Sequence, residues 1–198
     1  RVDRDGEPGP DRLGERVRIR GVAYSDSERY YGSSVLSFVH DDSGAGIAVY
    51  TTDVRSYRWK AGDRLEVVGV VVQYNGLSEI IPERVRVLGA GTSPAPTPLP
   101  EEGETLEAWE GRVITFEGTV TYVGQPGGSE SMTVVPDGNW PQAPRVYVHS
   151  TRDPMISLQH FEFGDRVRVV GPLAQYDREG LEEGYQIHIR TLADVQSV

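Results

Sequence analysis

Apolar and polar positions alternate along most of the chain, which is the pattern of strands in a half-buried sheet. In the segment 16–24, Val17 and Ile19 alternate with arginines, and this period of two predicts a strand with one face on a core. Similar segments at 35–40, 47–51, 64–73 and 78–88 are separated by turn-forming Gly, Asp, Ser and Asn. The first half of the chain therefore predicts a sheet of five strands.

The second half shows the same arrangement. Five further strands are predicted at 112–122, 131–135, 145–149, 166–174 and 185–192. A longer segment separates the third and fourth strands of each half, Val54–Lys60 in the first and Ser150–Phe163 in the second. Each has room for a helical turn or a short helix. An all-β domain of five strands with such an insert matches a Greek-key OB-type barrel.

An internal repeat supports two such barrels in tandem. The sequence GDRLEVVG at 62–69 matches GDRVRVVG at 164–171, and Gln-Tyr follows each at the same spacing, at 73–74 and 175–176. Weaker similarity relates Glu15–Val22 to Gly111–Gly118. The mid-strand glycines of both halves are expected where barrel closure needs a sharp bend or a close approach of two backbones; they are Gly21, Gly69, Gly118 and Gly171.

A proline-rich linker separates the halves. Four prolines stand at alternate positions from 94 to 100, and this spacing favours an extended, semi-rigid spacer over a helix or an inner strand. Glu101–Trp109 follows and is expected to hold a short helix. The predicted organisation is an acidic N-terminal segment (1–13), a first barrel (14–89), the linker (90–106) and a second barrel (107–198).

Composition narrows the function classes. The formal net charge is −10 and the pI is near 4.9, which disfavours nucleic acid as a partner, because phosphate binding needs a basic surface. Cysteine is absent, so disulfides and zinc–thiolate sites are excluded. No stretch approaches the roughly 20 apolar residues of a spanning helix, so we expect no direct membrane insertion. The chain lacks an initial methionine and reads as a piece of a longer protein.

The sequence offers no catalytic motif. It has no Gly-x-Ser-x-Gly elbow, and its single lysine, Lys60, does not stand in a phosphate-binding loop. The four histidines show none of the spacings typical of metal enzymes. The chain is therefore expected to be a binding module without enzymatic activity and without an obligatory cofactor.

Three segments carry a resemblance to a known group of domains. These are Phe38–Tyr50, Gly62–Arg64 and Gln73–Ile80. They resemble the OB-fold domains of bacterial secreted and surface proteins, which accompany secreted nucleases or form the sensor regions of membrane histidine kinases. Gln175–Val195 is similar to the closing strand of such tandem pairs. The resemblance implies a periplasmic or extracellular setting within a larger secreted or membrane-anchored protein.

Three functions remain open at this stage. The first is a sensor-type ectodomain that binds an unidentified protein or small ligand, which the acidic charge favours. The second is a module that binds single-stranded nucleic acid as an accessory to a secreted nuclease. The third is a structural spacer. The second predicts aromatic and arginine side chains on one continuous face.

Candidate ligand-binding residues come from the loops and strands that OB barrels use for binding. They are Tyr30 and Tyr31 in the loop after the first strand, Tyr50 on the third strand, Arg55 and Tyr57 beyond it, and Trp140 in a turn of the second half. Leu36, Phe38 and His40 share one face of the second strand. Phe38 and Trp59 are expected in the core, because large aromatics of small barrels are mostly buried.

The N-terminal segment resembles calcium loops of extracellular proteins. Asp3, Asp5 and Asp11 offer hard oxygen ligands and Gly6 a turn. The EF-hand spacing is broken, because Arg4 stands among these residues and no bidentate Glu follows. A calcium site and a plain acidic terminus are therefore both open.

Overall fold

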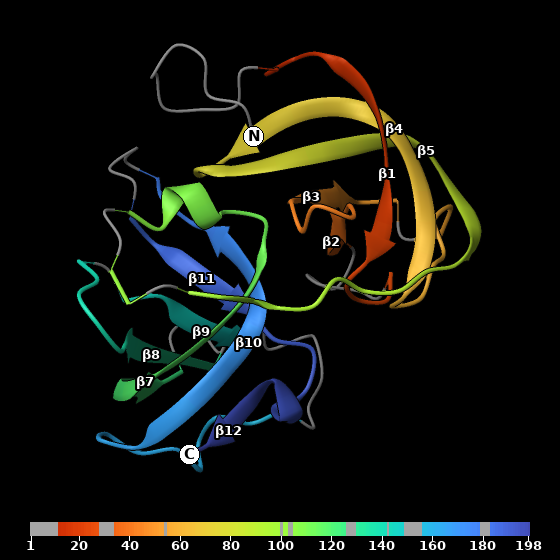
Figure 1. The fold of residues 1–198 in the computed structure, drawn as a ribbon. Helices are drawn as coiled ribbons and strands as arrows, with labels where there is room; N and C mark the ends of the chain where they lie inside the picture. The colour runs from red at the N-terminus through yellow and green to blue at the C-terminus, as the bar shows by residue number, and fades with distance from the viewer. Residues whose placement is uncertain are drawn as a thin grey trace.

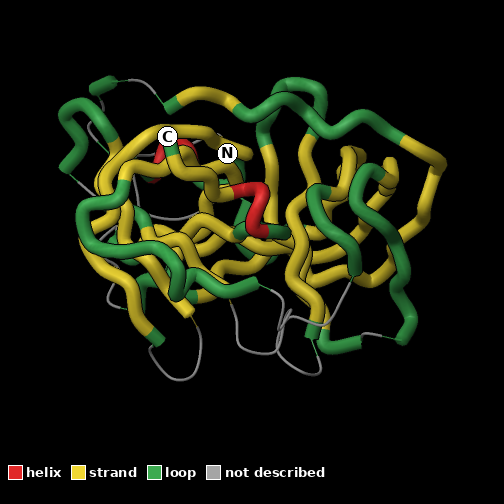
Figure 2. Tube along the Cα trace, turned by 90° about the horizontal axis from the view of Figure 1, so that it is seen from below, coloured by secondary structure: helices red, strands yellow, loops and turns green. Residues whose placement is uncertain are grey.

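The computed structural model describes residues 12–27, 34–53, 55–99, 101–102, 105–125, 130–141, 143–148, 156–178 and 183–198. These residues form two β-barrels that lie side by side (Figures 1 and 2). No helix in these ranges has the length and hydropathy needed to cross a membrane.

The first barrel closes on itself with the strand order β1-β2-β3-β5-β4. Its strands are β1 (Arg16–Ala23), β2 (Val35–His40), β3 (Gly46–Thr51), β4 (Asp63–Tyr74) and β5 (Leu77–Ala90). β3 pairs with β5 in parallel, and the other neighbours are antiparallel. This is the Greek-key arrangement that the sequence predicts.

The second barrel repeats this topology. Its strands are β7 (Val113–Gly124), β8 (Glu130–Pro136), β9 (Arg145–Val148), β10 (Arg166–Gln175) and β11 (Tyr185–His188). β9 and β11 are parallel, and pairing of β10 with β7 closes the barrel. Two short strands extend the sheet: β6 (Thr97–Pro98) beside β7 and β12 (Val195–Ser197) beside β10. The predicted fold class, two five-stranded barrels in tandem, is confirmed.

Each barrel has its own apolar core. Leu65, Ile80 and Val35 fill the first, and Met132, Ile114 and Leu173 are among the residues that fill the second. Trp59 is buried at the end of the first barrel, where its indole Nε1 donates a hydrogen bond to the Ser25 carbonyl at 3.1 Å. The prediction that Trp59 and Phe38 are buried is confirmed.

Two glycines at matching places allow the barrels to close. A Cβ at Gly21 would lie 2.4 Å from the His40 carbonyl oxygen, and one at Gly118 would lie 2.3 Å from that of Val135. The expected close backbone approach is therefore present at both. Strand pairing also corrects the alignment of Glu15–Val22 with Gly111–Gly118. Val17 pairs with Gly69 and Ile114 pairs with Gly171, so Val17 is structurally equivalent to Ile114. The first strands of the two barrels are therefore aligned one residue farther along than the sequence comparison placed them.

Several connections differ from the prediction. Residues 55–60 form turns and extended backbone in place of a helical turn, since Asp53 accepts backbone N–H bonds from Arg55 and Ser56 and fixes a local turn. The described part of the second insert, 156–163, is also not helical. The last predicted strand ends at His188, and a 3-10 turn, η3 (Leu192–Asp194), separates it from β12.

The linker follows the second barrel closely. Thr97 and Pro98 of β6 pair with Ile114 and Thr115, and Leu99 donates its N–H to the Thr115 carbonyl at 2.9 Å. An edge strand tolerates Pro98, because its backbone nitrogen, which carries no hydrogen, faces away from the neighbouring strand. The helix expected in Glu101–Trp109 is a single 3-10 turn, η1 (Glu107–Trp109).

Candidate functional site

The outward face of β2 and β3 is covered by the second barrel. Leu36, Phe38 and Ala48 form one apolar cluster with residues of both barrels, including Val113 and Ala174. The Phe38 ring meets the His188 ring edge to face at a centroid distance of 5.8 Å. This is the face of strands two and three that OB barrels commonly use for ligands. In the first barrel this face forms part of the interface with the second barrel.

The two backbones touch at Gly46 and Gly111. A Cβ at Gly111 would lie 2.1 Å from the Gly46 carbonyl oxygen, so only glycine fits there without displacement. Beside this contact, Nε2 of the buried His40 lies 2.7 Å from the Gly111 carbonyl oxygen. Burial lowers the pKa of His40 to about 4, so its imidazole is neutral at pH 7 and Nε2 carries the proton that it donates.

The tip of the β4–β5 hairpin reaches the second barrel. Asn75 and Gly76 turn with positive φ angles of 48° and 89°. The Asp177 N–H donates to the Asn75 carbonyl at 2.6 Å, and Gly76 packs so closely on Gln175 that a Cβ would lie 2.3 Å from its amide oxygen. The hairpin tip is thereby fixed to the end of β10.

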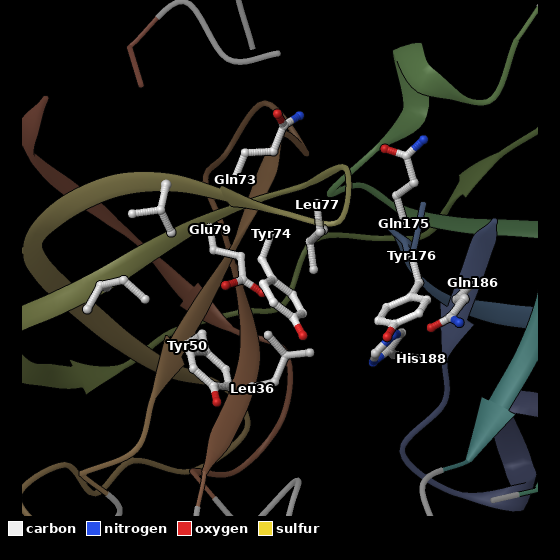
Figure 3. Close-up of a pocket in the computed structure, with 12 residues that line it drawn as sticks. Leu36, Tyr50, Gln73, Tyr74, Leu77, Glu79, Gln175, Tyr176, Gln186 and His188 are labelled. Carbon is white, nitrogen blue, oxygen red and sulfur yellow. The ribbon is translucent and has the colours of Figure 1, made fainter. Parts of the chain in front are cut away.

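A pocket of about 460 Å³ opens between the barrels below this tip. Figure 3 shows Tyr50 and Tyr74 on one side and Tyr176 and His188 on the other. The remaining lining residues are Leu36, Val72, Gln73, Leu77, Glu79, Ile81, Gln175 and Gln186. Both barrels are needed to form this pocket.

Tyrosines dominate its entrance. Tyr74 is 59% exposed and Tyr176 is 36% exposed, and their ring centroids lie 6.5 Å apart with the planes at 62°. The Arg178 guanidinium lies 5.2 Å from the centre of the Tyr176 ring, and its Nε donates to the Tyr176 hydroxyl at 3.0 Å. Exposed phenol rings with a guanidinium beside them suit the stacking of a planar ligand.

The interior is mostly apolar, with a few polar groups and little charge. Burial and the nearby Glu110 carboxylate raise the pKa of Glu79 to about 7, so near pH 7 a large fraction of its carboxyl is protonated. Amide groups come from Gln73, Gln175 and Gln186, and each can both donate and accept hydrogen bonds. Of the described residues that line the pocket, none is a lysine or an arginine. The lining favours an uncharged, flat ligand with mixed donors and acceptors.

One residue predicted from the sequence, Tyr50, lies in this pocket. Tyr57 is half-buried and donates its hydroxyl to the Pro82 carbonyl at 3.1 Å, Arg55 is exposed in a turn, and Trp140 packs partly buried against the core of the second barrel. Tyr30, Tyr31, Asp3, Asp5 and Asp11 lie outside the described residues. The described residues contain no group of three or more His, Cys, Asp or Glu placed to hold a metal ion.

The sequence interpretation missed Tyr74, Tyr176 and the two glutamines that precede them. The signal was the repeated Gln-Tyr, which was used only to identify the duplication. Gln73 and Tyr74 are the last two residues of β4, whereas Gln175 ends β10 and Tyr176 follows it. The packing of the barrels brings all four residues to one pocket.

Comparison with known proteins gives one curated relative and a set of solved structures. A scan against protein-family models finds no match. The chain is 28% identical over 145 residues to "Endonuclease YhcR" of Bacillus subtilis (strain 168). The match covers 68% of this chain and 12% of that protein, so the chain spans about an eighth of the length of this relative.

Several solved structures are similar to this chain at low sequence identity. The p204 HINb domain has a TM-score of 0.38 at 13% identity, covering 96% of this chain and 100% of that one. A replication protein A heterotrimer bound to ssDNA has a TM-score of 0.36 at 9% identity, covering 96% of this chain and 50% of that one. At these values the likenesses carry no functional argument.

Proposed function

We propose that the chain binds single-stranded nucleic acid, as a non-catalytic accessory module of a larger nuclease, and that bases enter the pocket between the barrels. The observation that carries this proposal is the pair Tyr74 and Tyr176 at the entrance, with Arg178 against the second ring. Base–aromatic stacking supplies about 1–3 kcal/mol per base in single-strand binding proteins.

The chemistry of the interior supports a base as the ligand. Glutamine amides can pair with the donor and acceptor edges of a base, and a protonated Glu79 adds a further donor. A phosphate would find no lysine or arginine among the described lining residues. The pocket therefore suits the base, and the phosphates are expected outside it.

The relative named as an endonuclease supports the setting. Its similarity runs over 68% of this chain and includes 12% of its own length, so most of that protein lies outside the matched segment. A binding module that delivers a strand to nuclease chemistry elsewhere in a long polypeptide fits this division. The secreted setting and the absence of catalysis in this segment are parts of the proposal.

A sensor-type module is the second candidate, and the size of the pocket favours it. A volume of about 460 Å³ with the buried His188 and Glu79 in its wall suits a small ligand, since ligand pockets typically span roughly 300–1,000 Å³. A free nucleoside tests this alternative, because it offers the same base without a strand.

The test is a fluorescence-anisotropy titration with labelled single-stranded DNA and RNA at low salt, with a free nucleoside as competitor. We expect dissociation constants of roughly 10⁻⁴–10⁻⁶ M or tighter. Absence of binding to both strands over that range would overturn the proposal. If the free nucleoside competes at concentrations no higher than those at which the strands bind, the small-ligand candidate is favoured.

A further inference from the structure

The outer face of β1, β4 and β5 carries a group of arginines. In one row across the sheet Arg18 pairs with Val68, which pairs with Arg84; in the next, Arg20 pairs with Glu66, which pairs with Arg86. Arg64 belongs to the following row, opposite Val22. We call Arg18, Arg20, Arg64, Arg84 and Arg86 the arginine face. All five are exposed in a chain whose net charge is −10.

A single carboxylate lies beneath these arginines. The Glu66 side chain is 5% exposed, and its Oε2 accepts hydrogen bonds from Nε and Nη2 of Arg20 at 3.0 and 2.8 Å. Hydrogen bonding by Arg20, with the charge of its neighbours, lowers the pKa of Glu66. Arg84 and Arg86 stand farther away, at 3.7 and 4.0 Å. Glu66 forms ion pairs with three arginines but carries one negative charge, so the arginine face keeps a positive excess.

The excess guanidinium groups face solvent. The side chains of Arg20, Arg84 and Arg86 are 67%, 54% and 62% exposed. Arg16, at the margin, is paired with Glu83 at 2.7 Å and adds no net charge. Exposed guanidinium groups in fork geometry are well suited to phosphate oxygens.

The second barrel shows that the fold does not require this face. By strand register, Arg20 corresponds to Glu117, Arg64 to Arg166 and Glu66 to Arg168. There, Arg166 forms ion pairs with Asp137 and Glu117, and Arg168 donates to Gln196. The same positions in the second barrel are therefore balanced in charge, whereas the first barrel keeps its charge unbalanced.

We infer that the arginine face binds the phosphates of a nucleic-acid single strand whose bases occupy the pocket. This inference rests on the proposed function and assigns the phosphate contacts that the pocket lacks. The two sites lie on the outer side of one hairpin: Tyr74 and Glu79 stand near its tip, and Arg84 and Arg86 farther along β5. Figure 1 shows β4 and β5 curving from the inter-barrel side around the first barrel.

The distance along the hairpin suits a strand of several nucleotides. Glu79 and Arg86 are seven positions apart on β5, which corresponds to roughly 23 Å at about 3.3 Å per residue. OB-fold proteins occupy about 4–16 nucleotides per barrel. A short oligonucleotide therefore fits the pocket alone, while a longer one reaches the arginine face.

The experiment compares oligothymidylates of about 4 and about 16 nucleotides, with a duplex of the longer length, by fluorescence anisotropy over a salt series. The variant is Arg84→Gln/Arg86→Gln, which keeps Arg20 on Glu66. Its matched control is Arg166→Gln/Arg168→Gln, which removes two arginines from β10, the counterpart of β4 in the second barrel. Arg18→Gln/Arg64→Gln is the second test variant, and circular dichroism confirms folding of each.

We expect both test variants to bind the long strand roughly tenfold more weakly, with a salt slope lower by about 1.4, and to bind the short strand as the wild type does. The control should match the wild type on both. Unchanged affinity of both test variants for the long strand overturns the inference and leaves the proposed function intact. A duplex bound as tightly as the single strand also overturns it. A wild-type protein that binds no oligonucleotide overturns the proposed function and the inference together.

Discussion

Tyr74 and Tyr176 meet edge to face across the boundary between the barrels, with ring centroids 6.5 Å apart. They occupy the same place in the internal repeat, each preceded by a glutamine that lines the same pocket. The two copies of the duplicated Gln-Tyr dipeptide therefore line opposite sides of one pocket. The predictions below test this site and the interface that forms it.

Substitution of either tyrosine should weaken binding of single strands. Tyr74→Ala or Tyr176→Ala removes a stacking surface, and we expect the dissociation constant to rise roughly fivefold to a hundredfold, as a loss of about 1–3 kcal/mol gives. Tyr122→Ala is the control, because Tyr122 is 49% exposed on β7 outside the pocket. Equal loss in all three variants in anisotropy titrations would contradict a role for the pocket.

Glu79 should make the protein less stable as pH rises. The folded-state pKa of about 7 lies above the ordinary value of 4.5, so the folded state holds its proton longer, and stability is lost as pH rises from about 4.5 to about 7. We expect Glu79→Gln to gain stability relative to wild type over this range, by up to about 3 kcal/mol. Urea unfolding at about pH 5 and about pH 8 measures this. Glu162→Gln, at an exposed position outside the pocket, is the comparison variant.

His40 should act in the opposite direction. Its folded-state pKa of about 4 lies below the ordinary value of 6.5, so stability is lost as pH falls from about 6.5 to about 4. His40→Gln retains an amide donor for the Gly111 carbonyl and cannot ionise. The stability difference between the variant and wild type should therefore shift in favour of the variant on acidification, by up to about 3 kcal/mol. A constant difference in urea unfolding across that range would refute this assignment.

Gly111 tests the contact between the two backbones. Gly111 has φ +80°, and an added Cβ would strike the Gly46 carbonyl oxygen. Gly164 has φ +93° with nothing within 4 Å of the added Cβ, so Gly164→Ala carries the conformational cost alone. We expect Gly111→Ala to lower the free energy of unfolding by about 1–3 kcal/mol more than Gly164→Ala, because it adds a steric clash. Gly111→Ala should also weaken binding of single-stranded nucleic acid. Equal losses of unfolding free energy in Gly111→Ala and Gly164→Ala would argue against a tight contact between the barrels.

The sequence predicts the barrels well because period-two alternation and turn residues act locally. The strands around Val17, Leu65 and Val167 lie close to their predicted positions. The packing of one barrel on the other is harder to predict from the sequence, because an apolar row such as Leu36 and Phe38 suits a ligand-binding face and an interface equally. Its use as an interface depends on partners far along the chain, such as Val113 and Ala174.

The candidate site was predicted poorly for the same reason. Tyr50 was found because it lies on the expected strand, whereas Tyr74 and Tyr176 become neighbours only when the hairpin tip docks on β10. Trp140 packs against the core of the second barrel and lies outside the pocket. Tyr30, Tyr31 and the calcium ligands Asp3, Asp5 and Asp11 stay predictions.

The docked hairpin tip has a consequence for synthesis of the protein. Tyr74 is translated about a hundred codons before Tyr176 and His188, which form the facing wall of the pocket. In a nascent chain that ends before the second barrel, the apolar face of β2 therefore lacks the residues that cover it. The pocket is complete only after the second barrel has been synthesised and has packed onto the first.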